Sequence, residues 1–496
     1  MKAETHKKRL KILITAAVIL VIVMAAVAAA VYFFGTASVY FYTPSDTVQV
    51  RRALKGSEVS LDPPAPIEGY SFVGWENEWG ELESRQSISL YEDTYYSAVY
   101  SVALNSEEHA PYMFADEYGL FRPNDTMTRG EAAQMLYSLL SVMVKGSDNF
   151  LDVSADDACY KATAALKELN VVSGSRFHPD DPITRRELLE MLSAFYPCLP
   201  EKYEFADVDS SDPDYTIFCT AAAYGWIESG NKTELKPDAE LTRYEIAALM
   251  NRVLGRSAAG DRPNVMGFVL DVTPDDSFYS DVAEAVIDHS YSTDNGNESW
   301  TANASFDKKE RGLYLAGTEL YFINGNGFVL KNYTENGFAF DENGRYTCGM
   351  PELDELVQEL LSGLIDDSMD QTEMLEAIYY YTVDHFSYLK RNIYDFRDTS
   401  WVNEEAYAML TTGSGNCYCY AAVFYQLARA LGFDAQIYSG YIGIERSKHG
   451  WVEIELEGEP YIFDPEMEMA YMKNHGQKVN MFMMSYKEAR KWAYTR

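Results

Sequence analysis

Two cysteines lie close together near the C-terminus, in the segment Gly413-Ser-Gly-Asn-Cys417-Tyr-Cys419. Apolar residues then recur at helical spacing as far as Leu431, and Gly432 is typical of a helix end. The pattern predicts a helix that begins at Cys417. The unsatisfied amides and the dipole at such a position favour the thiolate, which is the nucleophilic form of cysteine. The chemistry expected here is therefore nucleophilic attack by sulfur.

A histidine and an aspartate follow at a spacing that could serve this cysteine. Of the seven histidines, His449 begins a strand-like run that ends at Leu456. A turn near Gly458 leads to a second apolar run that ends at Asp464. On neighbouring strands, the carboxylate could fix the imidazole tautomer while the imidazole handles the proton of the thiol. The two arms are unequal in length, so a contact requires a bulge or a strand offset.

These three elements, in this order, resemble the transglutaminase-like superfamily. The matching segments are Gly415 to Ala421, His449 to Glu453, and Asp464-Pro465, within a region taken as 351–496. The resemblance implies an α+β papain-like fold in which Cys417 is the nucleophile, His449 the general base and acid, and Asp464 the orienting acid. Cys419 is interpreted as non-catalytic.

The resemblance also implies a reaction class. A cysteine of this kind attacks a peptide or carboxamide carbonyl and forms a thioester, which water or an amine then resolves. We expect a peptidase or amidase, rather than a cross-linking acyltransferase, that acts on an envelope peptide or protein and requires no metal or organic cofactor. The alternative is a scaffold or peptide-binding protein whose C-terminal domain keeps the fold without turnover.

A second motif recurs in the middle of the chain. Its copies are Thr128-Arg-Gly-Glu131, Thr184-Arg-Arg-Glu187 and Thr242-Arg-Tyr-Glu245, spaced by 56 and 58 residues. Each Thr-x-x-Glu is a capping box, so a helix is expected to follow each copy. A shorter signature precedes the later copies, as Phe150-Leu-Asp-Val153 and Phe205-Ala-Asp-Val208, and recurs as Val269-Leu-Asp-Val272.

This two-part repeat, over 105–291, resembles the S-layer homology family. The resemblance implies an all-α region that binds cell-wall polysaccharide through the motif arginines Arg129, Arg185 and Arg243. A guanidinium suits acidic polymers because it offers paired donors in one plane. The alternative is that each arginine only pairs with a neighbouring acidic residue. The first copy lacks the shorter signature, and the last signature lacks a following motif.

The N-terminus carries an apolar run of 23 residues, from Ile12 to Phe34. At about 1.5 Å per residue, such a helix would span a hydrocarbon core of about 30 Å. We therefore predict a transmembrane helix over 12–34, with the basic tail 1–11 in the cytoplasm and the bulk of the chain outside. A cleaved signal peptide is the alternative, because Ala28-Ala-Ala30 offers small residues.

Two further segments separate these parts. Residues 37–102 alternate apolar and polar side chains, and the stretch from Gly69 to Trp75 resembles the Listeria/Bacteroides-type surface repeat, which implies a small β-grasp-like module. Its role is a spacer or, alternatively, a binding module. Residues 292–350 contain Asn-Gly turns between short aromatic runs, which predicts a linker of β-hairpins.

Composition supports a multidomain, extracellular protein. A chain of 496 residues is too long for one ordinary core, and a formal charge of -35 disfavours nucleic acid as a partner. Six scattered cysteines do not form a disulfide framework, and no paired CxxC motif predicts a metal site. The expected location is the cell wall of a Gram-positive bacterium, with a single-pass membrane anchor.

Overall fold

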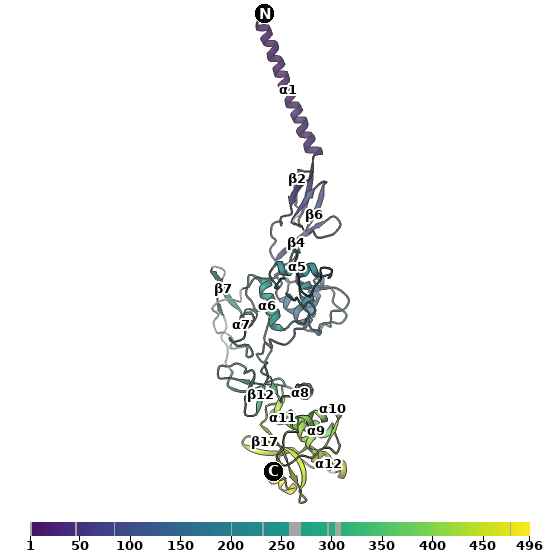
Figure 1. Cartoon of the computed structure of the whole chain (residues 1–496), viewed down its shortest axis with the longest axis vertical. Coiled ribbons are helices and arrows are strands. Elements are labelled where there is room, and N and C mark those ends of the chain that lie inside the picture. Colours follow the sequence, from purple (N-terminus) through teal and green to yellow (C-terminus); the bar gives the residue numbers. More distant parts are fainter. Residues whose placement is uncertain are drawn as a thin grey trace. The chain divides into compact units, whose positions relative to one another are not determined.

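The computed structural model describes residues 2–44, 47–83, 85–199, 201–230, 233–256, 269–294, 297–302, 309–476 and 478–496 (Figure 1). The chain divides into two compact units. The first comprises Met1–Met113, Asp125–Asp261 and Ser280–Thr301, and the second comprises Phe114–Asn124, Arg262–Tyr279 and Ala302–Arg496.

The N-terminal helix α1 runs from Lys2 to Phe34. Within the described part of the chain, no helix has an apolar stretch long enough to cross a membrane. The predicted transmembrane helix over 12–34 is therefore wrong, and the single-pass anchor based on it is not supported.

A small β module follows α1. Its strands are β1 (Thr36–Tyr42), β2 (Val48–Leu54), β3 (Ser57–Ser60), β4 (Tyr70–Asn77), β5 (Ser87–Leu90) and β6 (Thr94–Val102). Four of them form a mixed sheet in the order β2-β1-β6-β4, in which β1 and β6 are parallel, while β3 pairs with β5. Alternate residues such as Val39 and Phe41 are buried, and they pack with Trp75 and Leu90. The alternation in the sequence thus corresponds to one buried face.

The repeat region is helical. Its helices are α2 (Arg129–Ser138), α3 (Tyr160–Glu168), α4 (Arg185–Ser193), α5 (Tyr215–Ala223), α6 (Arg243–Leu254) and α7 (Tyr279–Val286). As the capping boxes predict, α2, α4 and α6 each begin directly after the motif threonine, with both capping hydrogen bonds present.

Backbone hydrogen bonds join the three motif copies in a cycle. The amide of Met127 donates to the carbonyl of Leu241 at 3.1 Å, Leu241 donates to Ile183 at 3.0 Å, and Ile183 donates to Met127 at 2.9 Å. Each copy thus contacts both others through the residue just before its capping threonine. The copies form a closed ring of three.

The shorter signature has a defined role. The carboxylate of Asp152 accepts hydrogen bonds from the amides of Phe177 and His178 at 2.8 and 2.9 Å. Asp207 binds the equivalent amides of the third copy, and Asp271 binds those of the first, at Phe121 and Arg122. The first motif copy and the last signature, each incomplete in the sequence, therefore complete one another.

Short strands connect the repeats to the C-terminal domain. They are β7 (His289–Asp294), β8 (Asn297–Ala302), β9 (Gly312–Ala316), β10 (Glu319–Ile323), β11 (Tyr333–Glu335), β12 (Phe338–Phe340) and β13 (Tyr346–Thr347). Strand β9 pairs with β10, and β11, β12 and β13 form a second sheet, in both cases antiparallel. The Asn343-Gly344 turn joins β12 to β13, whereas β9 and β10 are joined through Gly317-Thr318, and the Asn-Gly pairs at 324–327 follow β10.

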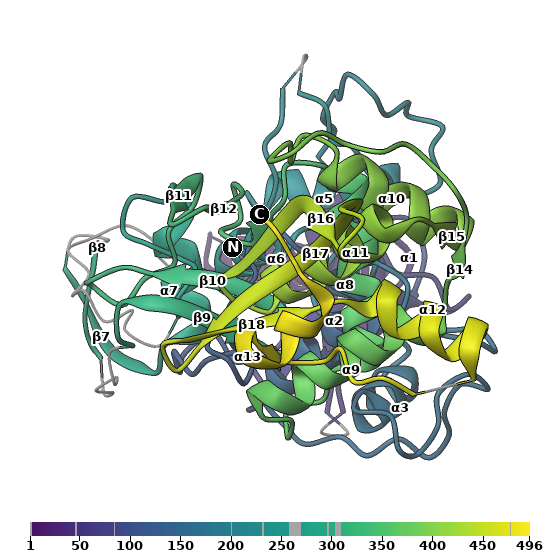
Figure 2. The same ribbon diagram turned by 90° about the horizontal axis from the view of Figure 1, so that it is seen from below.

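The C-terminal part is an α+β domain. Its elements are α8 (Pro351–Leu364), α9 (Gln371–Asp384), β14 (Ser387–Tyr388), α10 (Val402–Thr412), β15 (Ser414–Gly415), α11 (Cys417–Ala430), β16 (Ala435–Ile442), β17 (Ser447–Leu456), β18 (Glu459–Phe463), α12 (Pro465–His475), β19 (Met484–Ser485), α13 (Tyr486–Ala489) and the 3-10 turn η1 (Arg490–Trp492). The sheet has the order β16-β17-β18-β19 and is antiparallel. Helix α11 packs on its β16–β17 side, between the sheet and the helices α8, α9 and α10 (Figure 2).

Candidate active site

Cys417 is the first residue of α11, as the sequence predicts. The side-chain oxygen of Asn416 caps the helix by accepting hydrogen bonds from the amides of Tyr418 and Cys419 at 3.1 and 3.4 Å. Cys417 is 8% exposed, while the rest of the first turn is almost fully buried. The thiol thus lies at the positive end of a rigid, buried helix.

His449 lies on β17, which runs directly beside the start of α11. The close approach depends on Gly450, because a Cβ at this position would lie 2.9 Å from Cδ1 of Tyr418 and 3.2 Å from its Cα. No side chain fits between the strand and the helix at that point. The neighbouring residue His449 is consequently held against Cys417.

Asp464 follows β18 directly and is the N-cap of α12. In the β17–β18 ladder Val452 lies opposite Phe463, and the pairing ends there because Pro465 begins the helix. The segments from His449 and from Asp464 to the β17–β18 turn differ in length, so an offset is required for the two residues to meet. The offset arises where the chain leaves β18 and turns into α12. This turn brings the Asp464 carboxylate back toward His449.

The Asp464 carboxylate has three hydrogen-bond partners. Its Oδ2 lies 2.7 Å from Nε2 of His449 and accepts a hydrogen bond from the Tyr494 hydroxyl at 2.6 Å. Its Oδ1 accepts from the amide of Met467 at 3.1 Å. The hydroxyl of Tyr379 donates to the Asp464 backbone carbonyl at 3.2 Å. Both oxygens and the main chain are therefore fixed, which sets the orientation of the imidazole.

His449 is a buried base between two acidic groups. Burial disfavours its charged form, but the charges of Asp464 and Cys417, together with hydrogen bonds to both, raise the pKa of His449 well above its ordinary value. Because Nε2 contacts Asp464, Nδ1 is the ring nitrogen left to interact with Cys417. The surroundings favour the protonated form of His449.

Glu466 is a further buried acid beside this pair. Its Oε2 lies 4.0 Å from Nδ1 of His449, and burial raises the pKa of Glu466 to about 7, despite the opposing effect of His449. His449, Asp464 and Glu466 place three potential metal ligands within 4.8 Å of one another. Because both ring nitrogens of His449 already face Asp464 and Cys417, we interpret this group as proton-handling and not as a metal site.

Cys419 has a different environment from Cys417. It is fully buried, and its sulfur lies 2.9 Å from Oε2 of Glu405. Burial and the Glu405 carboxylate raise the pKa of Cys419 to about 12. A thiol that stays protonated and inaccessible is a poor nucleophile, which supports its interpretation as non-catalytic.

The three motif arginines lie in the ring of repeats, and each pairs with a glutamate of another copy. Arg129 contacts Glu187, Arg185 lies 3.5 Å from Glu245, and Arg243 lies 3.6 Å from Glu131. These cyclic ion pairs are partly buried, with 14 to 20% of each arginine side chain exposed. The three arginines are therefore arranged alike, and each uses some of its hydrogen-bond donors in an ion pair within the ring.

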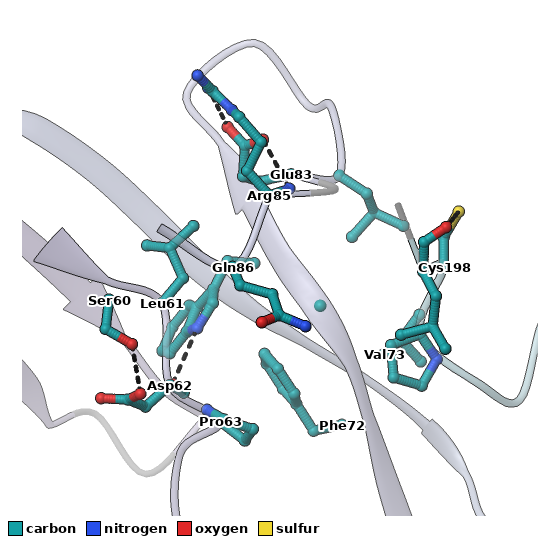
Figure 3. A pocket seen from close by; sticks show the side chains of 15 residues that line it. Ser60, Leu61, Asp62, Pro63, Phe72, Val73, Glu83, Arg85, Gln86 and Cys198 are labelled. Atoms are coloured by element: carbon teal, nitrogen blue, oxygen red, sulfur yellow. Dashed lines mark hydrogen bonds and ion pairs between the residues drawn. The ribbon is translucent and has the colours of Figure 1, made fainter. Parts of the chain in front are cut away.

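A separate pocket of about 560 Å³ lies in the first unit, between the β module and residues 197–199. Phe72 and Gln86 face it from one side and Cys198 from the other (Figure 3). The indole nitrogen of Trp75 donates to the Asp62 carbonyl at 3.2 Å and closes one wall. None of the predicted catalytic residues lines this pocket.

The sequence did not predict three residues of the C-terminal site. Tyr494 and Tyr379 fix Asp464, and Glu466 lies beside His449. Glu466 could have been noticed as an acid two residues after Asp464. The tyrosines carried no signal, because they reach the site only through the fold, from the chain terminus and from α9.

Comparison with known proteins agrees with this organisation. Residues 358–465 match the family model of the transglutaminase-like superfamily, and residues 113–133 and 149–189 match that of the S-layer homology domain. The chain is 32% identical over 206 residues to a cellulosome-anchoring protein of Acetivibrio thermocellus, covering 38% of this chain and 45% of that protein. It is 33% identical over 161 residues to a surface-layer 125 kDa protein of Lysinibacillus sphaericus, covering 31% and 14%. The chain thus spans less than half of either relative.

A solved structure from Cytophaga hutchinsonii, described as a candidate cysteine protease, is similar at 20% identity and a TM-score of 0.20. The match covers 28% of this chain and 45% of that one. At this level the likeness carries no argument of its own, so the assignment depends on the family models. The chain contains S-layer homology sequence within residues 113–189 and, over residues 358–465, a domain of the transglutaminase-like superfamily.

Proposed function

We propose that the C-terminal domain is a cysteine-dependent acyl-transfer enzyme that hydrolyses peptide or carboxamide bonds. The observation that carries this proposal is the 2.7 Å contact between Nε2 of His449 and Oδ2 of Asp464, beside a cysteine at a helix N-terminus. A nucleophile, a base held against it and a carboxylate that orients the base are what thiol catalysis requires. The match to the transglutaminase-like superfamily supports this reaction class.

The proposed reaction has two steps. Sγ of Cys417 bonds to the carbonyl carbon, the C–N bond breaks, and the amine leaves with a proton from His449, so that a thioester remains. Water then attacks the thioester carbon and gives a proton to His449, the C–S bond breaks, the acid leaves, and Cys417 and His449 together retain the proton for the next cycle. The amide of Cys417, at the N-terminus of α11, is placed to stabilise the developing oxyanion.

The test of this proposal compares envelope peptides from cells that carry the wild-type chain with those from cells that carry Cys417→Ser. Peptides that accumulate uncleaved in the variant identify the substrate, and new termini in the wild type identify hydrolysis. Isopeptide-linked products would instead identify amine transfer. Identical peptide sets, together with Cys417 labelling by a thiol electrophile no faster than the exposed Cys198, would leave a non-catalytic scaffold.

We further propose that the repeat ring holds the protein at the cell-wall surface by binding wall polysaccharide through Arg129, Arg185 and Arg243. The S-layer homology match and two relatives, a cellulosome-anchoring protein and a surface-layer protein, support this location. The three arginines lie at equivalent positions of one ring, so a repeating acidic polymer would meet the same donors three times.

This second proposal is tested by sedimentation of the protein with purified wall polysaccharide. Replacing the three arginines by lysine keeps the charge but removes the paired donors, and should weaken binding. Replacing Glu131, Glu187 and Glu245 by glutamine is the matched control, because it removes the same ion pairs and leaves the arginines. Equal loss in both variants would mean that the arginines act only within the ring. An Arg176→Ala variant, at an exposed position, should bind as the wild type does.

A further inference from the structure

Two histidines and a glutamate that lie far apart in the sequence meet in the interior of the first unit. Nδ1 of His109 lies 3.0 Å from Nε2 of His289, and Oε1 of Glu284 lies 2.9 Å from the first nitrogen and 3.3 Å from the second. All three residues are buried, with at most 5% of any of them exposed. Three ligand-type atoms therefore converge on one point in the interior.

The distances among these atoms fit a tetrahedral metal site. For metal–ligand bonds of about 2.0 to 2.1 Å, neighbouring ligand atoms of a tetrahedron lie about 3.3 Å apart. The observed separations of 2.9 to 3.3 Å need only spread by a few tenths of an ångström to admit an ion. Imidazole nitrogens with one carboxylate oxygen are a donor set that zinc accepts.

The ring of His289 is oriented as a metal ligand requires. Its Nδ1 lies 2.9 Å from the carbonyl oxygen of Ile287, a contact in which only the nitrogen can donate. With the proton on Nδ1, the neutral ring directs the lone pair of Nε2 toward His109 and Glu284. A backbone carbonyl that fixes the tautomer of a ligating histidine is the usual arrangement around protein-bound metals.

The other side of the cluster is fixed by Arg256, which is itself buried. Its guanidinium donates to the carbonyl of Glu108 at 2.8 Å and to that of Ala110 at 3.1 Å, on either side of His109. The ring of Tyr291 stacks on His109, with centroids 3.8 Å apart. The position of His109 is therefore set before any ion arrives, which lowers the cost of binding one.

We propose that His109, Glu284 and His289 bind one Zn²⁺ ion, with water in the fourth position. The ion would join the segment that precedes the repeats to α7 and β7, which follow them, and so would stabilise the folded repeat region. Binding energy at a site that exists only in the folded chain adds to the stability of the fold. This inference does not depend on the proposed enzyme function.

The test uses the full chain in a Cys417→Ala background, which removes a competing thiolate ligand. After chelator treatment and dialysis against Zn²⁺, we expect one zinc per chain by mass spectrometry of the metal. His289→Gln and Glu284→Gln should each weaken zinc binding at least about 100-fold, because loss of a ligand costs more than loss of a supporting contact. His178→Gln, whose side chain is 58% exposed, should bind as its parent does.

Two readouts make the outcome decisive even if one variant folds poorly. Co²⁺ in place of zinc should give the visible absorption of a tetrahedral ion without a thiolate charge-transfer band. Zinc should also raise the melting temperature of the parent but not that of Glu284→Gln. The proposal is overturned if the parent takes up no zinc at micromolar concentration. It is equally overturned if the glutamine variants retain the full zinc content.

Discussion

Asp464 holds the Nε2 side of His449 at 2.7 Å, and the opposite side of the same ring faces Cys417. The carboxylate thus decides which nitrogen of the imidazole is available to the thiol. It also contributes the largest of the effects that raise the pKa of His449. Asp464 therefore sets both the orientation and the charge of the His449 imidazole. Substitutions can separate the two effects.

Asp464→Asn should lower turnover of the substrate by about 100- to 10,000-fold, because the amide can hold the wrong tautomer and brings no charge. It should also move the alkaline limb of the pH–rate profile to lower pH. The direction of this shift follows from the raised pKa of His449. The imidazolium protonates the leaving amine, and it persists above pH 6.5 only because the Asp464 carboxylate favours the charged ring. The measurement is kcat/KM against pH.

Tyr494→Phe is the matched control for this effect. It removes one hydrogen bond to Oδ2 of Asp464 but keeps the negative charge beside His449. We expect a loss of about 10-fold, consistent with one hydrogen bond to a charged group, and an alkaline limb close to that of the wild type. An Asp464→Asn profile that coincides with the wild-type profile would contradict the assigned role of the carboxylate.

His449→Ala should remove the enhanced reactivity of Cys417 toward iodoacetamide. His449 is the base beside the sulfur, and without it the sulfur is left only with the helix N-terminus. Labelling rates for each cysteine, measured by peptide mass spectrometry, should place wild-type Cys417 well above Cys198. In the variant the rates at Cys417 and Cys198 should become comparable. Buried Cys419 serves as the unreactive reference in both proteins.

Local patterns predicted where the helix at Cys417 begins, but not the contact between His449 and Asp464. The helix that starts at Cys417 follows from apolar spacing and from the glycines around it, and the structure has that helix. The contact between His449 and Asp464 did not follow, because the strand offset depends on where β18 ends and α12 begins. That boundary is set by Pro465 together with tertiary packing.

Gly450→Ala should lower turnover, though by less than the roughly 100-fold that accompanies a displacement of a catalytic group by about 1 Å, because the backbone here must shift by only a few tenths of an ångström. The new Cβ would lie 3.2 Å from the main chain of Tyr418, so β17 must move away from α11 and take His449 with it. Gly363→Ala is the control, since a Cβ there meets nothing within 4 Å. Wild-type activity in both variants would show that the close approach is not needed for catalysis.

The repeat region shows the same balance between local signals and long-range contacts. Capping boxes gave the starts of α2, α4 and α6, because a capping box is a local signal. The closed ring, and the pairing of Asp271 with the first copy, depend on contacts across more than a hundred residues. The cluster of His109 with His289, 180 residues apart, was invisible for the same reason.

Compared with the wild type, Glu466→Gln should raise the unfolding free energy of the C-terminal domain more at pH 8 than at pH 5. Burial raises the pKa of Glu466 from 4.5 to about 7, so the folded chain binds more protons than the unfolded chain between these values. The stability that the neutral carboxyl provides is thus fully present below about pH 4.5 and is lost as pH rises toward 7. The loss amounts to about 3 kcal/mol at most, at about 1.4 kcal/mol per pH unit.

Hydrogen exchange of the buried amides of α11 gives the unfolding free energy of this domain separately from the rest of the chain. The wild type should lose protection between pH 5 and pH 8, after correction for intrinsic exchange, whereas Glu466→Gln should lose much less. Glu459→Gln, at an exposed position of β18, should behave like the wild type. The Glu466 carboxylate lies 4.0 Å from Nδ1 of His449, so a charged His449 could keep Glu466 ionised. If the stability of the wild type and of the variant depends equally on pH, Glu466 stays ionised throughout this range and the prediction fails.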